Sequence, residues 1–186
     1  MKRILLILAF VLLWSQSAWA DTFGNSAGAN DGEGGATNPT CSIFTPASSG
    51  TITKITARFN WSSSDSNFRV AIYNASAGTP TTFIAQSSSD VLITATGDYD
   101  ATVSASITGG ASYALCVFTN GGDAGVLFTN GSSGDGHQEV GTYPTFPSPY
   151  GTDFPNTNLY RIWATYTPSG GATCKGGLTL LGVGGC

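Results

Sequence analysis

Alternation of apolar and polar positions is clearest in residues 50–80, GTITKITARFNWSSSDSNFRVAIYNASAGTP. Ile, Ala, Phe and Trp alternate with polar residues between positions 55 and 61, and Phe68, Val70 and Ile72 alternate in a second run. A period of two is that of a β-strand with one buried and one solvated face. Turn-forming residues follow each run. The stretch therefore predicts two strands whose apolar face needs a second layer to cover it.

The same pattern predicts further short strands along the chain. With the two above, they fall at residues 41–46, 51–61, 68–74, 81–86, 91–96, 98–107, 112–120, 125–129 and 159–167. Residues 112–120 are almost continuously apolar, which suits a central strand, and 159–167 carry aromatic residues on both faces, which indicates neighbours on both sides. Residues 21–40 and 130–158 show no period and are expected to be irregular.

This spacing of short strands without a helical stretch after residue 20 predicts an all-β fold. Because the first and last strands bracket the chain, we expect an antiparallel jelly-roll β-sandwich of about eight strands.

The two ends of the chain differ from this middle. Residues 1–20 join the basic Lys2 and Arg3, an apolar run and a small-x-small end at Ala18-Trp19-Ala20, which predicts a secretory signal peptide. The alternative, a membrane anchor, is disfavoured because a span needs roughly 20 apolar residues. We therefore expect a secreted or cell-surface protein with one domain, residues 21–167, and a Gly-rich tail, residues 168–186.

The net charge of the chain limits the classes of partner that we expect it to bind. Removal of Lys2 and Arg3 leaves five basic residues against eleven acidic ones, a net charge of −6, and charged residues make up only 10% of the chain. An acidic, lysine-poor surface argues against nucleic acid and against anionic membranes as partners. We expect no membrane span once the signal is cleaved.

Four cysteines, an even number, favour disulfides in an exported chain. Three pairings are open, and we favour Cys41–Cys116 within the domain and Cys174–Cys186 in the tail. The tail encloses a small apolar patch, residues 178–183, and is either a disulfide-closed loop or a segment that pairs with another chain.

Several segments occur in an order that resembles a known group of modules. They are FGNSAG, GTITKITARF, NFRVAIYNASAGTPTTFIAQS, ITGGASYALCV, TYPTFPSPYGT and LYRIWATYT. Together they resemble secreted jelly-roll modules of microbial and viral surface proteins, which are largely uncharacterised and are treated as accessory or carbohydrate-binding-like. The resemblance covers residues 21–167 and implies a fold and a non-catalytic binding role, but no catalytic motif.

The sequence contains few residues in a pattern typical of an enzyme active site. The single histidine, His137, lies in GDGHQEV without a G-x-S-x-G nucleophile turn, and is expected to be a solvated loop residue. Glu33 and Glu139 fall in segments expected to be loops, whereas a glycosidase needs a carboxyl in an apolar pocket. We assign no catalytic residue and expect no enzyme.

Carbohydrate binding is the preferred function, and the irregular residues 130–158 are its preferred site. Binding groups are commonly placed on long loops of a rigid scaffold. The candidate ligand-binding residues are Tyr143, Phe146, Tyr150, Phe154, Gln138 and Asp153. In the alternative interpretation, these rings and the nearby prolines fold back and seal the sandwich.

Calcium is the one cofactor with any support. Asn30, Asp31 and Glu33 could offer oxygen ligands, although their spacing is not that of an EF-hand.

A second function remains open beside the glycan-binding one. The chain would then be a structural component of an envelope, matrix or filament that self-associates through its tail or its edge strands.

Overall fold

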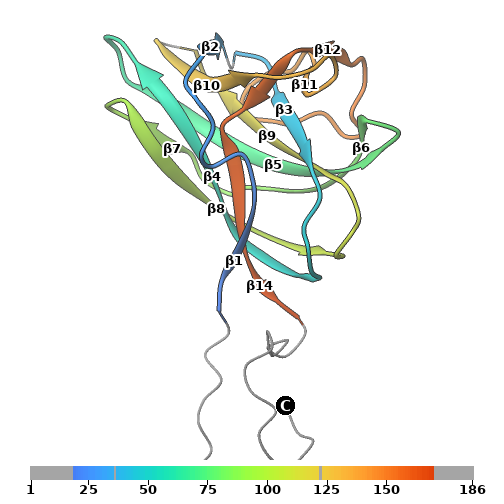
Figure 1. Cartoon of the computed structure of the whole chain (residues 1–186). Helices are drawn as coiled ribbons and strands as arrows, with labels where there is room; N and C mark the ends of the chain where they lie inside the picture. Colours follow the sequence, from blue (N-terminus) through green and yellow to red (C-terminus); the bar gives the residue numbers. More distant parts are fainter. Residues whose placement is uncertain (1–18, 36, 122, 170–186) are drawn as a thin grey trace, which may run out of the picture.

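A computed structural model describes residues 19–35, 37–121 and 123–169. These residues form two antiparallel sheets packed against each other and no helix (Figure 1). The predicted all-β sandwich is thereby confirmed, with fourteen strands in the described residues instead of about eight, while the jelly-roll topology stays a prediction. The proposed signal peptide lies outside the described residues except for Trp19 and Ala20, and so does the tail from residue 170 on, with Cys174–Cys186.

The first sheet is built around β4, the strand that the alternation marked most clearly. β4 pairs with β14 and β10 along one side and with β8 along the other, and β14 pairs in turn with β1. The strands of this sheet are β1 (Asp21–Gly24), β2 (Gly32–Gly35), β4 (Gly50–Trp61), β8 (Gly97–Ile107), β10 (Ala124–Asn130), β13 (Asn158–Tyr160) and β14 (Ile162–Pro168).

The second sheet is built around β9, which lies between β3 and β5. All seven β9 residues are buried, so the predicted central strand is confirmed. The strands of this sheet are β3 (Thr40–Phe44), β5 (Ser66–Ser76), β6 (Thr79–Gln86), β7 (Val91–Ile93), β9 (Tyr113–Thr119), β11 (Gly136–Gln138) and β12 (Phe154–Asn156).

The two strands of residues 50–80 belong to different sheets. The Ser-rich turn after β4 carries the chain across the sandwich, and Phe59 of β4 then packs against Phe68 of β5 with ring centroids 4.8 Å apart. Both rings are fully buried. The alternating apolar faces of the two strands are therefore the two halves of one core.

One face of β5 differs from the expectation. Ala71 and Tyr73 were expected on the solvated side, yet both are fully buried. They lie on the outer face of the second sheet, beneath the residues that follow β11. The alternation in β5 predicted the buried inner face of the strand correctly. The outer face is buried as well, because a segment more than 60 residues later in the sequence covers it.

Both segments expected to be irregular contain strands. β1 and β2 form in residues 21–40, and β11, β12 and the start of β13 form in residues 130–158. These strands have three or four residues each. β12 pairs with β11 in the same segment, and the others also pair with strands from other parts of the chain. Such strands carry too few positions to show a period, so local pattern misses them.

The closing strand is confirmed with one break. Tyr160, Ile162, Ala164 and Tyr166 are fully buried, as their alternation predicts. β14 lies between β1 and β4, in agreement with the aromatic residues on both of its faces. At Arg161 the chain passes from β13, which pairs with β10, to β14.

Candidate binding surfaces

Residues 139–153, called here the strap, connect β11 to β12 and pack on the outer face of the second sheet. Phe146 is 2% exposed and Tyr150 7% exposed. The Tyr150 ring meets the Tyr73 ring edge to face, with centroids 5.3 Å apart. Neither Phe146 nor Tyr150 leaves a face free for a sugar in this structure, which is the arrangement of the alternative interpretation, in which the rings seal the sandwich.

Hydrogen bonds fasten the strap to the sheet. The Tyr73 hydroxyl donates to the carbonyl oxygen of Pro147 at 2.7 Å, and the Tyr150 backbone N–H donates to the Thr81 carbonyl at 3.0 Å. Burial raises the pKa of the Tyr73 hydroxyl well above its usual range. The strap is thus held on the second sheet both by ring packing and by hydrogen bonds from side chain and backbone.

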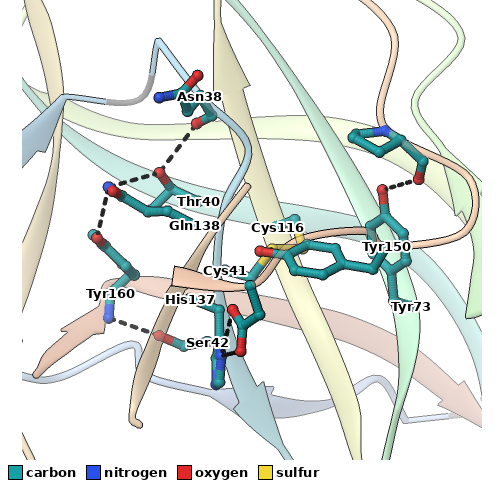
Figure 2. The surroundings of a disulfide bond; sticks show 12 residues. Asn38, Thr40, Cys41, Ser42, Tyr73, Cys116, His137, Gln138, Tyr150 and Tyr160 are labelled. Atoms are coloured by element: carbon teal, nitrogen blue, oxygen red, sulfur yellow. Dashed lines mark hydrogen bonds and ion pairs between the residues drawn. A yellow bond between two sulfur atoms is a disulfide. The ribbon is translucent and has the colours of Figure 1, made fainter. Parts of the chain in front are cut away.

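Beneath the strap lies the Cys41–Cys116 disulfide, which joins paired positions of β3 and β9 and confirms the predicted bond. Both sulfur-bearing residues are fully buried. Figure 2 shows the Tyr150 ring beside the disulfide, and the Tyr150 hydroxyl lies 3.9 Å from Cys41 Sγ. The strap therefore shields the disulfide from solvent.

His137 is not the solvated loop histidine that the sequence suggested. It lies on β11, is 1% exposed, and its Nδ1 is 2.9 Å from a carboxylate oxygen of Asp153 (Figure 2). The β11 strand pairs with β3 so that His137 stands opposite Cys41, on the covered face. Its Nε2 contacts no hydrogen-bond partner among the described residues.

Glu139 begins the strap as a buried carboxyl group. It is 6% exposed, and its Oε1 accepts a hydrogen bond from the Gly151 backbone N–H at 2.5 Å. Burial raises the pKa of the Glu139 carboxyl, and the nearby negative charge of Asp153 raises it further. Relative to a glutamate in water, this environment therefore disfavours the ionised carboxylate, although the Gly151 hydrogen bond offsets part of that effect.

The other predicted ligand-binding residues do not converge. Gln138 Nε2 donates to the Tyr160 hydroxyl at 3.3 Å, and Tyr143 is half-buried against Phe118. Asp153 is engaged by His137, whereas Phe154, at the edge of the sheet, is 52% exposed. Of the six candidate residues, Phe154 alone presents a largely exposed ring.

The three predicted calcium ligands are spread over different partners. Asn30 Oδ1 accepts from Arg161 at 2.7 Å, Asp31 Oδ2 from the Asn130 backbone at 2.8 Å, and Glu33 Oε2 from Asn60 at 2.6 Å. Among the described residues, no group of three or more His, Cys, Asp or Glu side chains is arranged to hold a metal ion. Calcium binding stays a prediction.

A shallow, open depression that the sequence did not reveal lies on the outer face of the first sheet. It consists of two hollows of about 300 and about 270 Å³ that share Glu33 as a lining residue. The first is lined by Asn30, Gly32, Glu33, Asn60, Thr96 and Leu127. The second is lined by Glu33, Gly35, Ser62, Asp123, Ala124 and Gly125. These two hollows are called the Glu33 groove below.

Strand pairing places the polar groups of the Glu33 groove. Gly125 of β10 stands opposite Asn60 of β4 and Gly35 of β2. A Cβ atom at Gly125 would lie 3.1 Å from Glu33 Cβ, so the missing side chain keeps the floor low. A side chain at this position would press against Glu33 and the Gly34 carbonyl, which would have to shift by a few tenths of an ångström.

Hydrogen bonds orient these side chains in a row. The Thr96 hydroxyl donates to Asn60 Oδ1 at 3.1 Å, and Asn60 Nδ2 donates to Glu33 Oε2 at 2.6 Å. The row crosses from the turn before β8, over β4, to β2. An amide and a carboxylate thus lie side by side on the surface of the sheet, linked by hydrogen bonds between solvent-accessible side chains.

Arg161 binds the segment before β2, residues 26–30, which forms one wall of the Glu33 groove. Its guanidinium donates to Asn30 Oδ1 and, at 2.6 Å, to the carbonyl oxygen of Ser26. The side chain is 9% exposed, and burial, followed by the nearby Arg58 charge, lowers the pKa of Arg161. The buried arginine positions Asn30 at the Glu33 groove, although in the sequence Arg161 is only one position of the predicted strand 159–167.

Comparison with known proteins found no matching family model, and neither a curated protein nor a solved structure that matches the chain. Within residues 19–35, 37–121 and 123–169, no helix has the length and apolar character needed to span a bilayer.

Proposed function

We propose that this chain is a non-catalytic, secreted or cell-surface binding module, and that it binds carbohydrate in the Glu33 groove. The oriented row of Thr96, Asn60 and Glu33 beside two adjoining hollows carries the proposal. Sugars present neighbouring hydroxyl groups that donate and accept hydrogen bonds, and a preset amide–carboxylate pair suits such pairs of hydroxyls.

The chemistry of the lining supports this ligand class. One Glu33 oxygen accepts from Asn60, and a carboxylate has further lone pairs for hydroxyl donors. Leu127, 7% exposed, adds an apolar contact next to these groups. Hydrogen bonds to a charged acceptor are stronger than neutral ones, so Glu33 should contribute most of the polar binding energy.

The test begins with a glycan array probed with the mature chain, residues 21–186, with and without calcium. For each glycan bound, titration calorimetry compares the wild-type chain with Glu33→Ala and Asn60→Ala. Loss of a hydrogen bond to a charged group costs about 1.5–3 kcal/mol, so Glu33→Ala should weaken binding about tenfold or more.

Asp65→Ala is the matched control, because Asp65 is an exposed acid that lines neither hollow. It should bind as the wild-type chain does. Absence of any glycan ligand, or equal affinities of Glu33→Ala and Asp65→Ala, would contradict the proposal. Loss of binding in Phe154→Ala alone would move the site to the strap end.

A further inference from the structure

Most edge strands of the two sheets are short or covered, whereas the edge strand β8 is long and unpaired along one side. β8 has eleven residues and pairs with β4 along one side. Among the described residues, no backbone or side-chain group hydrogen-bonds to the backbone of β8 along its other side. A long row of free N–H and C=O groups is a template for pairing with another strand.

The other edges are protected by familiar devices. β1 has four residues, and β12 has three, one of them Pro155, which cannot donate to a neighbouring strand. β6 is engaged by the strap, since the Tyr150 N–H donates to the Thr81 carbonyl. β8 carries an irregularity as well, because its pairing with β4 changes register between Ile52–Ala105 and Lys54–Thr102, so that two β8 residues face Thr53. What sets β8 apart among the described strands is the length of its unpaired side.

The side chains of β8 suit pairing with an identical strand. On its outer face Thr102, Ser104 and Ser106 are exposed and uncharged, while its inner face is buried in the core. The only charges, Asp98 and Asp100, lie near its start and are paired with Arg58 and Lys54 of β4. Two antiparallel copies would therefore keep their acidic ends apart and bring their hydroxyl-bearing centres together.

We propose that β8 pairs antiparallel with the β8 strand of a second copy of this chain, around a twofold axis near Val103. Thr102 of each copy then lies opposite Ser104 of the other, and Asp100 lies opposite Ser106. The first sheets of the two copies become one continuous sheet. Glu33 and Asn60 of the Glu33 groove lie on β2 and β4, away from the shared edge, whereas Thr96 directly precedes β8.

Sedimentation velocity of the mature chain over a range of concentrations tests this pairing. The wild-type chain should form dimers as concentration rises. Ser104→Lys places two like charges beside the axis and should raise the dimer dissociation constant about tenfold or more. Mixing Ser104→Lys with Ser104→Glu should restore association, because opposite charges then meet across the axis.

Thr51→Lys is the matched control. Thr51 is exposed on the neighbouring strand β4, opposite Ser106, so this variant adds the same charge to the same face one strand inside the edge. It should dimerise as the wild-type chain does, and circular dichroism should show all variants folded. A wild-type chain that stays monomeric would overturn the proposal. So would equal effects of Thr51→Lys and Ser104→Lys, or dimers that disappear only when residues 170–186 are deleted.

Discussion

Replacement of Tyr150 by alanine tests whether the strap is a structural cover or a binding loop. The ring is 7% exposed, meets Tyr73 edge to face, and lies against the Cys41–Cys116 disulfide. Removal of a buried aromatic ring typically costs about 3–5 kcal/mol in free energy of unfolding, because the transfer energy is lost and a cavity remains. We expect Tyr150→Ala to lose stability in this range.

Urea unfolding of the mature chain, followed by fluorescence and circular dichroism, measures the loss. Tyr150→Phe keeps the ring and removes a hydroxyl whose contact is the 3.9 Å approach to sulfur, so it should cost about 1 kcal/mol or less. Phe154→Ala is a second control: its ring is 52% exposed and its removal should cost less than about 1 kcal/mol.

The opposite outcome would refute the structural interpretation of the strap. If Tyr150→Ala unfolds within about 1 kcal/mol of the wild-type chain, the ring is not part of the packed core. If that stable variant also loses a glycan ligand, Tyr150 is a binding platform and the strap opens in solution.

Two further predictions concern groups beneath the strap. Burial raises the pKa of Glu139, so its neutral form stabilises the fold at low pH, and this stabilisation is lost as pH rises through the raised pKa. Glu139→Gln should therefore resist urea better than the wild-type chain at neutral pH and lose that advantage at acid pH. An equal difference in stability at every pH would contradict the assignment. The Cys41–Cys116 bond spans 75 residues, and for a loop of this length the double Cys→Ala variant should lose about 4 kcal/mol by the loop-entropy model; a shift in the urea midpoint equivalent to less than about 1 kcal/mol would show that the reduced chain is already constrained.

The regular strands could be predicted from the sequence because their alternation is long enough to report a face. Phe59, Phe68, Val70 and Ile72 are core residues, as the pattern in residues 50–80 indicates. The fully buried β9 follows from its continuous apolar run. Of the three pairings that four cysteines allow, the favoured intradomain one, Cys41–Cys116, is confirmed.

The candidate site could not be predicted in the same way. Glu33, Asn60 and Thr96 lie in three segments that come together only through the pairing of β2, β10 and β4. The one local signal was the glycine-rich stretch around Glu33, which reads equally well as a loop. A groove of this kind depends on register between distant strands, and register is a tertiary property.

The sequence by itself determined that this chain is a β-sandwich with an apolar core, a disulfide and a polar, weakly acidic surface. Tertiary structure decided which polar residues are covered. His137 and Tyr73 are buried because the strap, which has no period of its own, finds enough apolar partners on the second sheet to pack there. Alternation records the environment that neighbouring residues share, whereas a long-range cover depends on surfaces that only the assembled sheets create.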